Sequence, residues 1–108
     1  MTNTDTRTHV DWLIDDAVCQ FRLRGTEEVF GLRDGLIIGA DASCDRVLSD
    51  PDGLVSKKHA RTFLEFGQWA IADLKSKNGL RMDGVSRPKF PLYPGLEVGI
   101  GGLILVAE

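Results

Sequence analysis

Glycine and proline divide this chain into segments too short for most helices. The sequence contains 12 Gly and 4 Pro, and turn signals recur every 6 to 12 residues, as in "SDPDG" at 49–53. Between these breaks the residues alternate apolar and polar, most clearly in "VCQFRLR" at 18–24, where Cys19, Phe21 and Leu23 share one face, the period of a half-buried strand. No segment has the 3.6-residue period of an amphipathic helix. The pattern predicts an all-β sandwich or barrel, in which loops at one end carry the chemistry.

The chain length predicts one domain. At 108 residues the chain can bury one core but not two. The polar, Thr-rich positions 1–9 predict a flexible tail, and the folded domain is expected over 10–108. The longest apolar stretches, "GLIIGA" and "GGLILVA", fall far short of the roughly 18 residues of a membrane span. With no signal peptide at the start, we expect a cytoplasmic protein without a membrane partner.

The sequence indicates no metal or cofactor site. Its two histidines and two cysteines, at positions 9, 59, 19 and 44, lack the spacing of metal ligands. Neither a phosphate-binding GxxxxGK[ST] nor a strand-linked GxGxxG is present, and "GIGGL" at 99–103 falls between two expected strands. We therefore expect reduced, structural thiols and no cofactor.

Charge is unevenly distributed. The total is −3, yet residues 56–81 carry six basic and two acidic side chains, a local net charge of +4. A basic island on an acidic chain favours a compact anionic ligand over a long nucleic acid, which the rest of the surface would repel. The alternative interpretation is a solvated loop face without a ligand.

A possible catalytic pair stands in "VSKKHA", where Ser56 lies three residues before His59. A serine nucleophile also needs a group that orients the base, and an oxyanion hole. The sequence offers no GxSxG elbow and no marked pocket. We therefore expect a protein that is not an enzyme, with hydrolysis as a distant alternative.

The two longest expected strands, 59–66 and 68–74, are separated by Gly67 and predict a hairpin. The loop before the first strand and the loop after the second should then emerge at the same end. Ser56 and Lys57 would lie near the segment 76–78, which reads Ser-Lys-Asn. Hydroxyls, an amide, ammonium groups and backbone N–H groups would converge there, a set of donors suited to phosphate. Alone, the Asn78–Gly79 pair would indicate only a turn.

Over about residues 18–106 the chain resembles the forkhead-associated (FHA) domain family. The resemblance is carried by five stretches: "IIG" at 37–39, "CDRVLSDP" at 44–51, "VSKKHA" at 55–60, "WAIADLKSKNG" at 69–79 and "LYPGLEVGIGG" at 92–102. It implies a β-sandwich of about eleven short strands that binds phosphothreonine peptides and has no enzymatic activity. Recognition of a phosphopeptide by loop residues is an established binding mode.

Several roles follow from the resemblance, position by position. Ser56 matches the serine that hydrogen-bonds the phosphate, and Lys57 and Lys77 match variable residues that often contact it. Asn78 matches the asparagine that bonds the peptide backbone. Structural support of the site is assigned to the residues that match the family's bracing histidine and its turn and strand-end glycines: His59, Gly79 and Gly39.

One position departs from the family. Where the family has Gly-Arg, this chain has Gly39–Ala40, and the missing arginine is a principal phosphate contact in the family. A charged hydrogen bond is worth roughly 1.5 to 3 kcal/mol, so its loss predicts about tenfold to hundredfold weaker binding. Arg46, where the family has an aliphatic residue, is a candidate replacement. The alternative function is a degenerate FHA scaffold that binds proteins independently of phosphorylation.

The final stretch, "PGLEVGIGGLILVAE" at 94–108, resembles the end of FHA modules that precede the ATPase core of bacterial enhancer-dependent transcription activators. It implies an N-terminal module of a longer regulator, acting downstream of a Ser/Thr kinase. Two Thr-x-x-Asp patterns, Thr2 with Asp5 and Thr8 with Asp11, are candidate phosphorylation sites that could dock on a neighbouring module.

Overall fold

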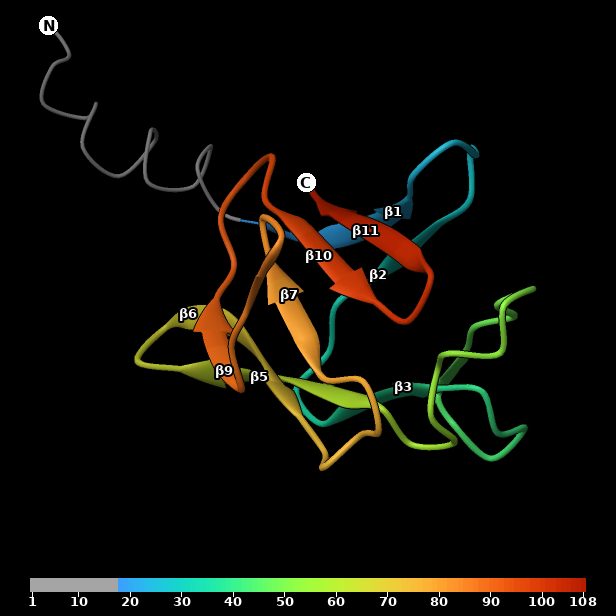
Figure 1. Ribbon diagram of the computed structural model, residues 1–108. Helices are drawn as coiled ribbons and strands as arrows, with labels where there is room; N and C mark the ends of the chain where they lie inside the picture. Colours follow the sequence, from blue (N-terminus) through green and yellow to red (C-terminus); the bar gives the residue numbers. More distant parts are fainter. Residues whose placement is uncertain (1–17) are drawn as a thin grey trace, which may run out of the picture.

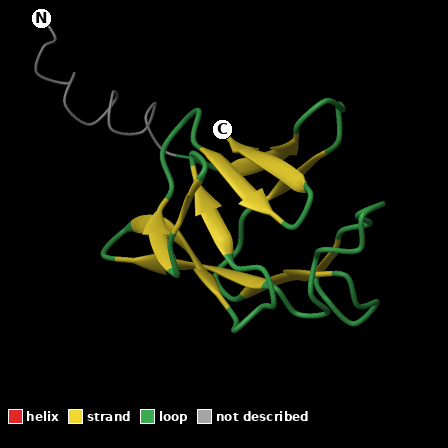
Figure 2. Cartoon of the chain, in the orientation of Figure 1, coloured by secondary structure: helices red, strands yellow, loops and turns green. Residues whose placement is uncertain are grey.

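The computed structural model describes residues 18–108, which form eleven strands and no helix (Figure 2). The strands are β1 (Gln20–Leu23), β2 (Val29–Gly31), β3 (Leu36–Gly39), β4 (Arg46–Val47), β5 (Ala60–Glu65), β6 (Gln68–Asp73), β7 (Leu80–Met82), β8 (Val85–Ser86), β9 (Lys89–Pro91), β10 (Glu97–Ile100) and β11 (Leu103–Ala107). Their short length follows from the turn residues between them, as the sequence predicts.

The strands form two sheets stacked in two layers (Figure 1). One sheet has the order β2-β1-β11-β10-β7-β8, and the other has the order β4-β3-β5-β6-β9. All the pairings are antiparallel except β3 with β4. The expected all-β sandwich of about eleven strands is confirmed.

The core lies between the inner faces of the two sheets. Phe21 and Leu105 from the first sheet, and Ile38 and Ile71 from the second, are completely buried there. Each occupies an inward position in its strand, because side chains alternate between the two faces of a sheet. In β1 this alternation holds for Phe21 but fails at Cys19, which lies one residue before the strand and is exposed, contrary to the shared face that we expected.

The expected hairpin is confirmed as β5 and β6. Their register pairs Ala60 with Asp73 at one end and Glu65 with Gln68 at the other. Gly101 and Gly102 form the turn between β10 and β11, so the "GIGGL" stretch serves sheet geometry, as we expected.

None of the residues that the structure describes belongs to a helix long and apolar enough to cross a membrane. The expected tail at 1–9, the first part of the expected domain and the two Thr-x-x-Asp patterns lie outside the described residues.

Candidate functional site

Two loops meet at the end of the hairpin where β5 begins and β6 ends. We call residues 54–59 and 74–79 the paired loops. Because Ala60 pairs with Asp73, the two loops emerge side by side, and the backbone N–H of Leu74 donates to the carbonyl of His59 (2.9 Å). The structure therefore brings together Ser56, Lys57, Lys77 and Asn78, which the sequence placed at one end of the hairpin.

His59 links the paired loops from within. Its side chain is completely buried; Nδ1 accepts a hydrogen bond from the backbone N–H of Ser56 (2.9 Å), and Nε2 lies 2.7 Å from the carbonyl oxygen of Gly79. An imidazole that accepts at Nδ1 and faces a carbonyl at Nε2 carries its single proton on Nε2. The ring is thus neutral, with both nitrogens used to hold the loops.

Ser56 and His59 do not form a nucleophile–base pair. The lone pair on Nδ1 is taken by the backbone N–H of Ser56, so it is not available to the hydroxyl. The Ser56 Oγ instead accepts a hydrogen bond from the backbone N–H of Lys77 (2.9 Å). That bond leaves the hydroxyl proton free to be donated to a ligand.

Asn78 ties the second loop to the first. Its Nδ2 donates to the carbonyl oxygen of Leu54 (2.9 Å), and its side chain is exposed. This bond uses one of the two donor hydrogens of the amide. The carbonyl oxygen and the second hydrogen keep their capacity to bond a peptide backbone.

Asp73 and Ser76 order the second loop. Asp73 Oδ2 accepts the backbone N–H of Ser76 (3.1 Å), and Asp73 Oδ1 accepts the Ser76 hydroxyl. The Ser76 Oγ accepts in turn from the backbone N–H of Gly79 (2.8 Å). The role of Asp73 was not predicted from the sequence, although Asp is a residue type whose side chain often bonds nearby backbone N–H groups in turns.

The β3–β4 connection supports the first loop from the other side. The backbone N–H of Ala40 donates to the carbonyl of Ser56 (3.0 Å), and the Cys44 thiol donates to the carbonyl of Lys57 (2.9 Å). Gly39 allows this approach, because a Cβ there would lie 2.1 Å from the Lys57 carbonyl oxygen. Residue 40 is exposed and bonded to Ser56, so a longer side chain at this position could reach the loop surface.

The paired loops carry a local excess of positive charge. Four exposed lysines stand in or beside them, and within residues 18–108 none pairs with a carboxylate: Lys57, Lys58, Lys75 and Lys77. A nearby carboxylate belongs to Asp41, whose pKa is lowered mainly by hydrogen bonds from the Ser43 hydroxyl and backbone N–H, and further by Lys57 and Lys58. The ammonium groups therefore remain available to an anionic ligand.

Arg46 is not part of this arrangement. Its guanidinium pairs with Glu28 and lies over the ring of Phe30, 4.7 Å from the ring centre. It therefore connects β4, at the edge of one sheet, to β2, at the edge of the other. The structure thus places the guanidinium of Arg46, the candidate replacement for the arginine missing at position 40, against Glu28 and Phe30 and not in the paired loops.

The potential metal ligands within residues 18–108 form no metal-binding group. No group of three or more potential metal ligands lies within the described residues. Cys19 and Cys44 are both free thiols, and burial raises the pKa of the Cys44 thiol above its ordinary value.

Comparisons with known proteins agree with this architecture. A search of curated protein sequences finds no match. Among solved structures, the chain is similar to the FHA-1 domain of Mycobacterium tuberculosis Rv1747, with 28% identity, a TM-score of 0.70 and coverage of 86% of this chain and 96% of that one. It is also similar to the FHA domain of CT664 from Chlamydia trachomatis, with 26% identity, a TM-score of 0.73 and coverage of 84% and 96%.

A third similar structure is the FHA domain of FhaA, complexed with the intracellular domain of Rv3910. It shows 25% identity, a TM-score of 0.73 and coverage of 82% of this chain and 98% of that one. The sequence model of the FHA domain matches residues 36–101, which is more than half of the chain. This chain therefore belongs to the FHA domain family.

Proposed function

We propose that the paired loops bind a phosphothreonine peptide, with Ser56, Lys57 and Lys77 at the phosphate and Asn78 at the peptide backbone. FHA domains are phosphothreonine-binding modules. One observation carries the proposal for this chain: the Ser56 Oγ accepts the backbone N–H of Lys77, which leaves the hydroxyl proton free for a ligand. Lys57 and Lys77 stand in the same loops and pair with no carboxylate within residues 18–108. A phosphate with a charge of about −1.5 to −2 offers the matching acceptors.

The bracing of the loops supports binding with little rearrangement. His59, Asp73 and Ser76 bond backbone groups of both loops, those of Ser56, Ser76 and Gly79, before any ligand arrives. The ordering entropy of the loops is then part of folding, so a peptide does not have to supply it. A preformed site of this kind suits rapid, reversible signalling.

Ala40 limits the affinity. The family's arginine is absent, and the Arg46 side chain is engaged with Glu28, so the lysines alone supply the charge. Ammonium groups act as point charges and lack the bidentate geometry of a guanidinium. We expect binding about tenfold to hundredfold weaker than with an arginine at this position.

The partner is a protein that a Ser/Thr kinase has phosphorylated. The FhaA domain is complexed with a protein domain in its structure, and we propose a phosphorylated protein as the partner of this chain. In this function the module connects a kinase to a longer cytoplasmic regulator, consistent with the resemblance of its last strands to those of transcription activators.

The test is a titration with a phosphothreonine peptide library and its unphosphorylated twin, followed by fluorescence anisotropy. We expect the wild type to bind only the phosphorylated form, and Ser56→Ala to lose most of that binding. Ser49→Ala is the control, because Ser49 is exposed and takes no part in the loop bonds described above.

Two results would contradict the proposal. Equal binding of both twins would favour the degenerate scaffold, for which Ala40 is the specific argument. Ester hydrolysis that Ser56→Ala abolishes would instead favour an enzyme.

A further inference from the structure

The tip of the β5–β6 hairpin has an unusual residue for its geometry. Glu65 pairs with Gln68, so the turn contains only Phe66 and Gly67, with φ angles of 54° and 76°. Two positive φ angles identify a type I′ turn, which prefers Asn-Gly. A bulky aromatic residue at positive φ is disfavoured. Folding therefore gives no reason for Phe66 at this position.

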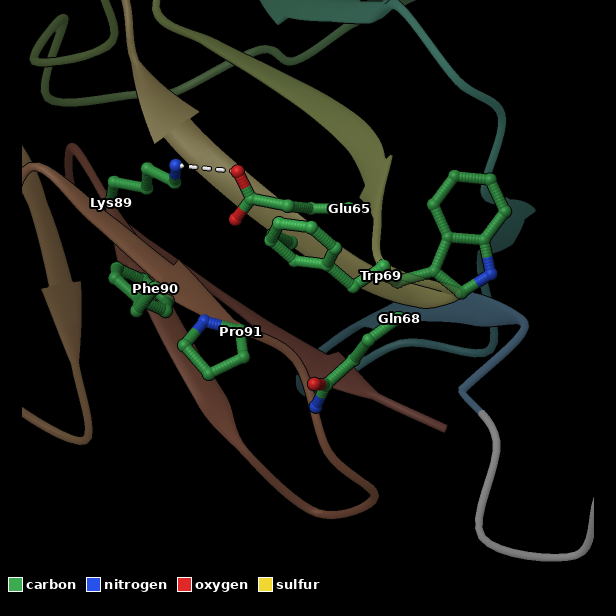
Figure 3. Close-up of a pocket in the computed structure, with 8 residues that line it drawn as sticks. Glu65, Gln68, Trp69, Lys89, Phe90 and Pro91 are labelled. Carbon is green, nitrogen blue, oxygen red and sulfur yellow. Dashed lines mark hydrogen bonds and ion pairs between the residues drawn. The ribbon is translucent and has the colours of Figure 1, made fainter. Parts of the chain in front are cut away.

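The Phe66 side chain is also fully exposed to solvent. It is one of the residues that line a groove of about 340 Å³ between the hairpin tip and β9. Figure 3 labels other lining residues, among them Trp69 and Pro91. Besides Phe66, its apolar lining consists of the half-buried Trp69 and the exposed Pro91, with the buried Ala70 and Phe90 beneath the surface. A fully exposed aromatic ring thus forms part of the rim of a depression that has room for a second ring, a combination typical of an interaction surface.

The groove is lined by one acidic and one basic residue. Glu65 and Lys89 both line it and form an ion pair of 2.9 Å. The pair is neutral as a whole and offers no net attraction to a strongly charged partner. A second copy related by a two-fold axis presents each of the two charges to its opposite, so the patch is self-complementary.

We infer that this surface binds a second copy of the chain. The Phe66 ring of each copy enters the groove of the other, and Glu65 of each lies beside the partner's Lys89. The contact uses side chains, because Pro91 in the edge strand β9 has no N–H to donate and hinders extension of the sheet.

The dimer would leave the paired loops free. Phe66 follows the last residue of β5 and His59 precedes the first, and six strand residues span about 20 Å. A two-fold axis at the tip therefore directs the two pairs of loops away from each other. Such a dimer could bind two phosphorylated segments at once and gain avidity.

Sedimentation velocity of the full chain over a concentration series tests the inference. An interface this small is expected to be weak, with dimer appearing at about 100 μM. Phe66→Asn should weaken dimerisation at least about 100-fold, because the two-fold symmetry removes two rings per dimer. Since Asn is preferred in a type I′ turn, the same variant should keep or raise the Tm, which separates docking from folding.

A charge reversal gives a second readout. Glu65→Lys places like charges across the two-fold axis and should weaken the dimer, and the double variant Glu65→Lys/Lys89→Glu should restore it. Concentration-dependent NMR shifts are expected at residues 64–69 and 89–91 but not at 54–59.

Three results would overturn the inference. The first is a wild type that remains monomeric at 1 mM, on the order of tenfold above the expected dimer range, and the second is a Phe66→Asn variant that dimerises as the wild type does. The third is a set of NMR shifts at the groove that are independent of concentration and disappear when residues 1–17 are deleted. The last would identify the chain's own N-terminal segment as the occupant.

Discussion

The two ends of the β5–β6 hairpin differ in what they leave exposed. Where β5 begins, His59, Asp73 and Ser76 bond the loop backbone, and lysines and hydroxyls remain at the surface. Where β5 ends, the turn needs no side chain to close it, and Phe66 is fully exposed beside an apolar groove. A single supersecondary unit thus presents a polar site for an anion at one end and an apolar surface at the other.

The difference shows how the fold separates two kinds of binding. Charged ligands require donors held in fixed positions, which buried braces such as His59 provide. Apolar association depends on exposed surface area and needs less exact positioning. The two ends are also about 20 Å apart along β5, so a substitution at one should have little effect on the other.

The largest effect is expected from His59→Ala. The substitution removes both ring bonds and leaves the Ser56 N–H and the Gly79 carbonyl without their partners, which should cost about 3 kcal/mol in the free energy of unfolding. Urea denaturation measures this loss. Phosphopeptide binding should disappear, while NMR shifts at the Phe66 tip stay unchanged. Thr62→Val is the matched control, because Thr62 is equally buried in β5 but bonds the Arg33 carbonyl and should spare the binding.

The second-largest effect on stability is expected from Gly39→Ala. The new Cβ would lie 2.1 Å from the Lys57 carbonyl oxygen, so the first loop must move, at a cost of about 2 kcal/mol. Gly31→Ala is the control, because a Cβ there comes no closer than 3.9 Å to the Cys19 carbonyl oxygen. Thermal unfolding compares the two variants. Equal stability would show that the loop end is more adaptable than its hydrogen bonds indicate.

Ala40→Arg should strengthen phosphopeptide binding. A guanidinium beside Ser56 can add charged hydrogen bonds to the phosphate, worth about tenfold to hundredfold in affinity. Ala42→Arg, at an exposed position in the same connection, adds the same charge elsewhere. Isothermal titration of both variants distinguishes geometry from charge. An equal gain in the two would mean that charge alone limits the site.

The smallest effect is expected in the pH dependence of stability. The Asp50 carboxylate accepts backbone N–H groups of Gly102, Asp52 and Leu54, with the Gly102 bond the main cause of its lowered pKa. A pKa below the unfolded value stabilises the fold above roughly pH 3.9, and this contribution is lost as the pH falls through the folded value. The Tm advantage of the wild type over Asp50→Asn should therefore be present at pH 7 and shrink below pH 4. A constant difference would contradict this.

Much of the site could be predicted because it depends on local pattern and spacing. Alternation and Gly67 indicated the hairpin, and the hairpin brought Ser56 near Lys77 before any coordinates were known. At Gly39 the Lys57 carbonyl comes so close that a Cβ would lie 2.1 Å from its oxygen, which agrees with the supporting role predicted for this glycine. Other features depended on partners far along the chain: Arg46 pairs with Glu28 in the opposite sheet, and Asn78 bonds Leu54. The positive φ in the second loop falls at Lys75 as well as at Gly79, and no residue preference indicates a lysine there.

The sequence by itself determined the strand-and-turn pattern, the hairpin and the family, because strand alternation and turn chemistry are local properties of the chain. Only the tertiary structure decided which polar groups remain free for a ligand. Contacts between segments apart in sequence hold His59 Nε2 at the Gly79 carbonyl and the guanidinium of Arg46 at Glu28. The bond from the Lys77 N–H to the Ser56 Oγ likewise leaves the hydroxyl proton of Ser56 available. Packing likewise decided that Phe66 remains exposed, because burial depends on which surfaces the folded sheets bring together.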